Sequence, residues 1–156
     1  MRYAVLAAGY LVVVAPSLAT EVSTQQHVHA MSHEVMPFDI AKTWHVFRMT
    51  TSGGSQKVVV RDAGFADQVT PIRQHLKEEA ARFQAGDFTD PSHLHGSGMP
   101  GLAEMRASAG RIRVACKDLP DGAEIVFTAS DIAAITAIHR WFGAQLSEHG
   151  ADARAE

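Results

Sequence analysis

Cysteine is almost absent from this chain of 156 residues: Cys116 is alone, so no disulfide can form within the chain. Basic residues form no stripe, because 14 Lys and Arg are interleaved with 17 Asp and Glu and the net charge is −3. This charge pattern argues against a nucleic-acid partner. After residue 19, no stretch is apolar enough to cross a membrane.

The first residues have the pattern of an export signal. Arg2 supplies a positive charge, an apolar stretch follows from Ala4 to Val14, and the small residues Ser17 and Ala19 suit signal peptidase. The apolar stretch is too short for a permanent membrane anchor. We therefore expect residues 1–19 to be a signal peptide, and the mature protein to be periplasmic or secreted without a membrane contact.

Histidine is over-represented. The chain has nine histidines, whereas a background of about 2% would give about three or four. Two segments repeat the order His-x-His followed by methionine, namely HVHAM at residues 27–31 and HLHGSGM at residues 93–99. In an extended chain, alternate side chains point the same way, so each segment could present two imidazoles to one ion.

The rest of the chain is typical of a single α+β domain over residues 44–150. Residues 44–86 have two strand-like runs around a Ser-Gly-Gly-Ser turn and then an apolar stripe at helical spacing, and residues 111–150 repeat this order. A shift of 66 residues aligns the apolar positions of the two segments. We expect two ββα units that form a four-stranded antiparallel sheet with two helices on one face.

The remaining segments lie outside these units. Residues 20–43 form a His/Met-rich arm, residues 87–110 form a His/Met loop between the units, and residues 151–156 form a tail. Pro91, Gly96 and Gly101 argue against a long helix in the loop. A loop of this length inside a small domain is often functional.

Imidazole and thioether together indicate copper. Imidazole binds copper, zinc, nickel and iron, and the soft thioether favours Cu(I). We expect the arm and the loop to meet and to supply His33, Met36, His95 and Met99 as ligands, with His45 as a substitute. The accessory ligands would be His27, His29 and His93.

The other aromatic side chains favour structural roles. His139 lies on an apolar helix stripe, His75 beside one and His149 at a helix end, so each is expected to be structural. Trp44 and Trp141 are expected to be core aromatics. Cys116 alternates with apolar residues and is expected to be buried.

Three segments of the chain resemble a family of small exported bacterial proteins, some labelled aspartate carbamoyltransferase. They are MSHEVMPFDIAKTWHVF, HLKEEAARFQAGDFTDPSHLHGSGMPGL and AIHRWFGAQLSEHGADA, and the resemblance covers nearly all of the mature chain. It implies export and no site residues. The carbamoyltransferase label would imply an S-T-R-T-R segment, an H-P-x-Q segment and a cytoplasmic substrate, and neither string occurs here.

These observations favour a periplasmic copper carrier or buffer, whose partners would be the metal ion and a protein that receives it. Zinc is the alternative ion. A haem-binding module would use His139 or His75 as an axial ligand. An enzyme is less favoured because no catalytic triad can be assigned, and a partner-binding domain with pH-sensing histidines is a further alternative.

Overall fold

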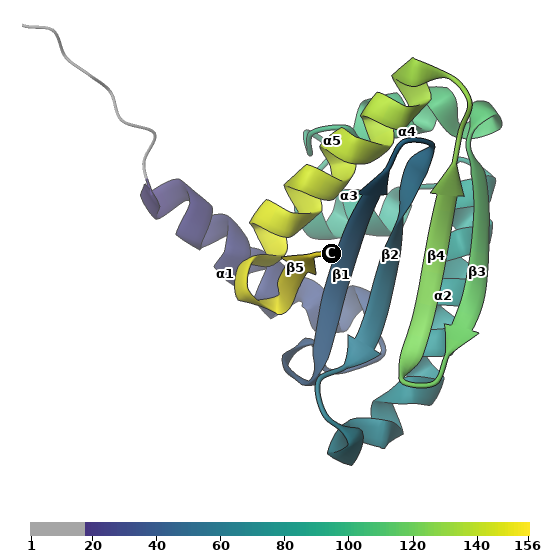
Figure 1. Cartoon of the computed structure of the whole chain (residues 1–156). Coiled ribbons are helices and arrows are strands. Elements are labelled where there is room, and N and C mark those ends of the chain that lie inside the picture. The colour runs from purple at the N-terminus through teal and green to yellow at the C-terminus, as the bar shows by residue number, and fades with distance from the viewer. Residues whose placement is uncertain (1–17) are drawn as a thin grey trace, which may run out of the picture.

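The computed structural model describes residues 18–156 and has an α+β fold (Figure 1). Of the predicted signal peptide, residues 1–17 lie outside this range. The helices are α1 (Leu18–Val35), α2 (Val69–Gln84), α3 (Thr89–His95), α4 (Leu102–Ser108) and α5 (Ile132–His149). The strands are β1 (Thr43–Thr50), β2 (Gly53–Val60), β3 (Arg113–Leu119), β4 (Gly122–Thr128) and β5 (Ala153–Ala155).

The five strands form one mixed sheet in the order β3-β4-β2-β1-β5. The first four are antiparallel to their neighbours, and β5 is parallel to β1, with His45 opposite Ala153. The α+β class is confirmed, but the predicted four-stranded antiparallel sheet with two helices is wrong in its counts. The fifth strand has only three residues, Ala-Arg-Ala, and it forms by pairing with the outer edge of β1.

Both hairpins form close to the predicted turns, and their boundaries differ by a few residues. β2 begins at Gly53, so three of the four residues of the expected Ser-Gly-Gly-Ser turn belong to the strand. Gly122 begins β4, where a Cβ atom would lie 1.9 Å from the carbonyl oxygen of Val58. Only glycine lets β2 and β4 approach this closely.

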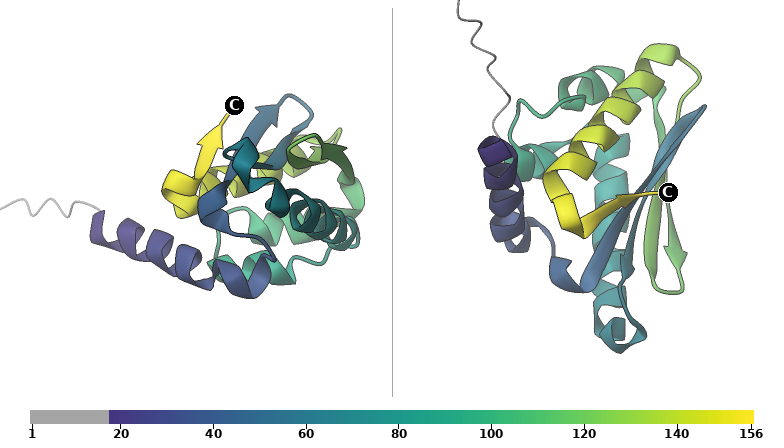
Figure 2. Two further views of the ribbon diagram at one scale, coloured as in Figure 1. Left: turned by 90° about the horizontal axis from the view of Figure 1, so that it is seen from below. Right: turned by 60° about the vertical axis from the view of Figure 1, so that its left-hand side comes forward.

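The helices cover one face of the sheet and leave the other open (Figure 2). Along β1, His45 and Phe47 point towards the helices, whereas Arg48 is exposed. The two long helices pack crosswise: α2 follows the β1–β2 hairpin but contacts β3 and β4, and α5 follows the β3–β4 hairpin but contacts β1 and β2. Each helix therefore ties the two hairpins together.

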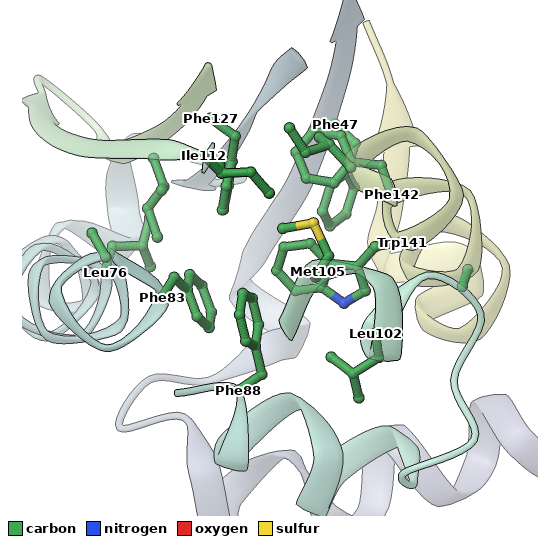
Figure 3. Close-up of a cluster of buried hydrophobic side chains, with 14 of the residues drawn as sticks. Phe47, Leu76, Phe83, Phe88, Leu102, Met105, Ile112, Phe127, Trp141 and Phe142 are labelled. Carbon is green, nitrogen blue, oxygen red and sulfur yellow. The ribbon is translucent and has the colours of Figure 1, made fainter. Parts of the chain in front are cut away.

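The core is aromatic and centres on Trp141 of α5, which is fully buried (Figure 3). Its ring is edge-on to Phe83, Phe88 and Phe127, with centroid separations of 5.5, 5.8 and 5.6 Å. These partners come from α2, the start of the inter-unit segment and β4. The core thus joins the helices, the sheet and the segment between the two units.

The predicted arm and loop are largely helical. Residues 18–35 form α1, which contacts α5 and α3, and the loop holds two seven-residue helices, α3 and α4. Gly96 and Gly101, both with positive φ, separate these two helices. At Gly101 a Cβ atom would lie 2.4 Å from the backbone nitrogen of Trp141, so glycine also lets α4 pack closely on α5.

The extended geometry expected for both His-x-His segments is therefore wrong. Residues two apart on a helix point in different directions, so neither pair presents two imidazoles to one side. No helix within residues 18–156 is both long and apolar enough to span a membrane.

Candidate functional site

A pocket of about 50 Å³ lies between the sheet and helices α1, α2, α3 and α5. This volume holds a few water molecules or a small ion. Its wall combines apolar side chains with groups that can titrate or form hydrogen bonds. The polar lining residues are His45, Gln56, His75, Glu79, Asp90, His95, Gln145 and His149.

Three histidines from different elements meet in this pocket. His45 is on β1 and points to the helices, His95 is the last residue of α3, and His149 is the last residue of α5. The rings of His45 and His149 are stacked with centroids 4.7 Å apart, and the ring of His95 lies edge-on to His149 at 5.0 Å. The three imidazoles thus form one contiguous cluster.

The carboxylate of Glu148 orients one of these imidazoles. Nδ1 of His95 donates a hydrogen bond to Oε2 of Glu148 at 2.8 Å, and the His95 side chain is only 2% exposed. In the neutral ring this tautomer has its proton on Nδ1, so the lone pair is on Nε2, which can act as a ligand. A carboxylate on the other ring nitrogen is the arrangement that orients metal-binding histidines.

The other two imidazoles are buried and lack hydrogen bonds at Nδ1. His45 is 2% exposed and His149 is 5% exposed, and neither Nδ1 has a partner in the described part of the chain. Burial lowers the pKa of His45 from 6.5 to about 3, with smaller effects from His75 and His95. Burial also lowers the pKa of His149 well below its usual value. Both rings are therefore neutral at physiological pH, the form that binds metals.

The lining of the pocket also includes a carboxyl pair, Glu79 and Asp90. Glu79 of α2 is 6% exposed, and burial together with a hydrogen bond to Asp90 raises its pKa to about 8. Asp90 also forms an ion pair with Arg82 at 2.8 Å. Glu79 is therefore protonated at neutral pH and shares its proton with Asp90.

Two carboxamides add unpaired acceptors to the lining of the pocket. The Oε1 atoms of Gln56 and Gln145 are buried and have no hydrogen-bond partner among residues 18–156. Unpaired buried polar atoms are costly. Several such atoms around one pocket therefore point to an occupant that satisfies them.

The pocket contains three of the eight residues predicted as ligands: Met36, His45 and His95. The arm and the loop do meet, because α1 contacts α3 and Nε2 of the exposed His93 lies 3.2 Å from Oε2 of Glu34. Met99 does not line the pocket and is part of the hydrophobic core at 5% exposure.

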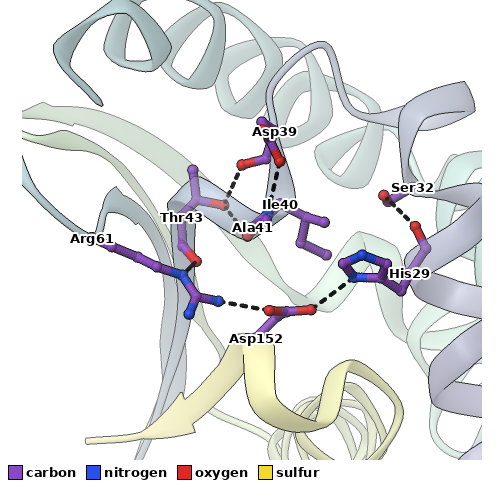
Figure 4. Close-up of polar contacts among 8 residues, drawn as sticks. All are labelled: His29, Ser32, Asp39, Ile40, Ala41, Thr43, Arg61 and Asp152. Atoms are coloured by element: carbon purple, nitrogen blue, oxygen red, sulfur yellow. Dashed lines mark hydrogen bonds and ion pairs between the residues drawn. The ribbon is translucent and has the colours of Figure 1, made fainter. Parts of the chain in front are cut away.

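The remaining predicted ligands lie on α1. His27 is exposed, whereas His29 and His33 line a separate surface groove. Nδ1 of His29 donates to Asp152 at 3.1 Å, and Asp152 in turn forms an ion pair with Arg61 at 2.6 Å (Figure 4). This network fixes α1 to the segment before β5.

Sequence reasoning missed His149, Gln145 and Glu79. His149 was expected to have a structural role because it ends a helix. Its stacking on His45 could not be predicted, because it depends on the turn that leads from α5 into β5. Glu79 gave a usable signal, since it lies within the apolar stripe of α2 between Leu76 and Phe83. A carboxylate on the buried side of a helix is unusual and could have been selected on that ground.

The structural roles expected for the other aromatic side chains are partly observed. Nε2 of His139 lies 3.0 Å from the carbonyl oxygen of Thr50 and 2.8 Å from that of Gly53, so a haem iron at this nitrogen would have to displace both contacts. Trp44 is not a core residue: it is half-buried, and the guanidinium of Arg61 lies 3.8 Å from its ring centroid.

The side chains, as they lie, do not form a metal site. Within residues 18–156, no three His, Cys, Asp or Glu side chains are arranged to hold an ion. The stacked rings of His45 and His149 explain this, because parallel rings do not direct their lone pairs to one point. Comparisons with models of protein families, with curated proteins and with solved structures find no match to this chain.

Proposed function

We propose that this chain is an exported copper-binding protein that holds Cu(I) in the buried pocket through His45, His95 and His149. Met36 adds a thioether from the end of α1. The observation that carries the proposal is the convergence of three buried imidazoles, two with an unpaired nitrogen and one oriented by a carboxylate. An ion would satisfy these nitrogens together.

The donor set favours copper over zinc. Met36 lies in the pocket wall, and a thioether stabilises Cu(I) but contributes little to Zn(II). Cys116, the single thiol, is on β3 and does not line the pocket, and burial raises its pKa above the usual value. Nitrogen and thioether ligands hold Cu(I) less tightly than thiolates, which suits a carrier or buffer that passes the ion to a receiving protein.

Metal binding in this pocket requires the rings of His45 and His149 to turn out of their stack. Each ring needs only side-chain rotation, because both lie beside the same cavity. His95 is already oriented by Glu148 and would serve as the fixed ligand. The ion would therefore first bind His95 and then recruit the other two imidazoles.

Replacing Met36 by Leu tests the thioether. We expect the affinity for Cu(I), measured by anaerobic competition with a chromogenic chelator, to fall at least about tenfold, equivalent to about 1.4 kcal/mol. Zn(II) affinity should change by less than about threefold, since zinc does not use this ligand. Leucine is close in volume to methionine, so the core is retained.

Met99→Leu is the matched control, because Met99 is also buried but lies outside the pocket. It should leave the affinity for both ions unchanged. An equal loss of Cu(I) and Zn(II) in Met36→Leu, or the same loss in Met99→Leu, would contradict the copper assignment.

A second candidate is an acid–base enzyme for a small polar substrate. The observation that favours it is Glu79, a pocket carboxyl whose pKa of about 8 is close to working pH. Metal analysis separates the two candidates. Chain purified from the periplasm without a histidine tag should carry at least about one copper per chain if it is a copper protein, and none if Glu79 acts as an acid without metal.

We further infer that the framework is a duplicated ββα unit, formed by β1–β2–α2 and β3–β4–α5. The shift of 66 residues that aligns the apolar positions supports this inference. If the framework is a duplicated ββα unit, α1 and α3 lie outside the repeat. Both helices contribute residues to the wall of the pocket.

A further inference from the structure

The helical form of α1 creates a histidine pair that an extended chain would not have. His29 and His33 are four residues apart, so they lie one turn apart on the same side of the helix, with Cβ atoms about 5–6 Å from each other. Both line one surface groove, together with Met36 and Phe38. His27, two residues before His29, does not line this groove.

The first histidine of this pair is held in place. Its Nδ1 donates to Asp152, which Arg61 also binds, and in the neutral ring this tautomer leaves the lone pair on Nε2 (Figure 4). Two imidazoles at this helical spacing can share one ion, as in the metal-binding motif H-E-x-x-H. The side chain of His29 is 56% exposed and His33 is also exposed, so an ion can reach the pair from solvent.

Met36 connects this groove to the buried pocket. It is 8% exposed and lines both cavities, and it is one turn beyond Ser32 at the end of α1. Its thioether is therefore a soft ligand in the wall that separates the two histidine clusters. Cu(I) could pass this wall without leaving ligands that suit it.

We propose that His29 and His33 form a second, outer site for Cu(I), from which the ion passes Met36 to the buried histidines. The ion stays Cu(I) throughout, so no oxidant or reductant is involved. The outer site stands on its own geometry, whereas the transfer step rests on the copper-binding function proposed above.

The test is the rate and stoichiometry of copper loading. Mature chain is mixed under anaerobic conditions with a coloured Cu(I)–chelator complex, and the loss of colour is followed over time. Wild type should take up two equivalents of Cu(I). The double variant His29→Ala/His33→Ala should take up one, at least about fivefold more slowly, with a final affinity within about twofold of wild type.

His27→Ala is the matched control, since it removes an exposed histidine from the same helix without changing the groove. It should load like wild type. Wild-type stoichiometry and rate in the double variant, or equal slowing in His27→Ala, would overturn the outer site. Met36→Leu should load more slowly while keeping the outer equivalent, and an unchanged loading rate would overturn the transfer step.

A variant of the buried cluster separates this inference from the proposed function. His149→Gln should lose the inner equivalent and keep the outer one. If wild type binds one equivalent that only the His29/His33 variant loses, the outer site stands and the buried copper site fails. If only His149→Gln loses it, the outer site fails. Should His149→Gln lose its near-ultraviolet circular dichroism, His95→Gln takes its place with the same expected outcome.

Discussion

Replacing Glu79 by Gln should abolish a loss of stability at alkaline pH and expose a loss at acidic pH. In the wild type, the folded state keeps a proton on Glu79 up to a pKa of about 8, whereas the unfolded carboxyl releases it near 4.5. The stability from this group is therefore complete below pH 4.5 and is lost as the pH rises towards 8, by about 1.4 kcal/mol per pH unit. Between pH 6 and pH 8.5 the wild type should lose about 2–3 kcal/mol, and the variant should not.

His45 acts in the opposite direction. Its pKa is about 3 in the folded state and 6.5 when unfolded, so the unfolded chain binds more protons between these values. Its contribution is complete above pH 6.5 and falls by about 2–3 kcal/mol between pH 7 and pH 4.5. His149 shifts in the same direction. In the wild type, Glu79 offsets much of this acid loss, so Glu79→Gln should show it in full.

Urea unfolding of the metal-free protein at pH 4.5, 6, 7 and 8.5 measures both effects. Glutamine matches the shape of a protonated glutamate and can donate to Asp90, so the variant should fold. Glu78→Gln, an exposed neighbour on the same helix, is the control and should give the wild-type pH curve. Parallel curves for wild type and Glu79→Gln would contradict the protonated state assigned to Glu79.

Replacing Trp141 by Ala should destabilise the fold by about 3–5 kcal/mol, a large part of the total for a domain of this size. Trp141 is 0% exposed and contacts rings from α2, β4 and the inter-unit segment. Alanine would leave a cavity at the point where these elements meet. The loss in the free energy of unfolding is measured by urea unfolding, where a lower midpoint at an unchanged m-value reports a change in stability alone.

Trp141→Phe should cost clearly less than Trp141→Ala. The indole Nε1 is buried without a hydrogen-bond partner in residues 18–156. The change to phenylalanine therefore removes no hydrogen bond and keeps most of the ring contacts. Ile132→Ala is the surface control, because Ile132 is 78% exposed, and it should change stability by less than about 0.5 kcal/mol. Similar losses in Trp141→Phe and Trp141→Ala would contradict the role assigned to the ring contacts that phenylalanine retains.

The features that sequence patterns predicted are those with a local cause. The apolar stripes of α2 and α5 have helical spacing, and turn residues mark both hairpins, so these elements could be placed within a few residues. The strand β5 and the helix α1 have no comparable signal. Residues 153–155 become a strand only by pairing with β1. The apolar face of α1 is weak, and its residue Val28 is buried only because other elements of the fold pack against it.

The candidate site was less accessible to prediction for the same reason. Met36, His45 and His95 were selected by residue type, and they do reach one pocket. His149 and Glu79 join them only because α5 and α2 pack across the sheet from opposite hairpins. The error over the His-x-His segments came from assuming extended backbone where helices form. With that error corrected, the relevant spacing on α1 is four residues rather than two.

The short strand β5 has a consequence for self-association. Opposite His45, Val46 and Phe47, it occupies hydrogen-bonding groups on the outer edge of β1, and the backbone of Glu156 continues the contact by donating to the carbonyl oxygen of Phe47. Without residues 153–156 this edge would be bare, and bare strand edges recruit strands from other molecules. A chain shortened by these four residues should therefore form sheet-linked oligomers, which light scattering would detect as a rise in mass with concentration.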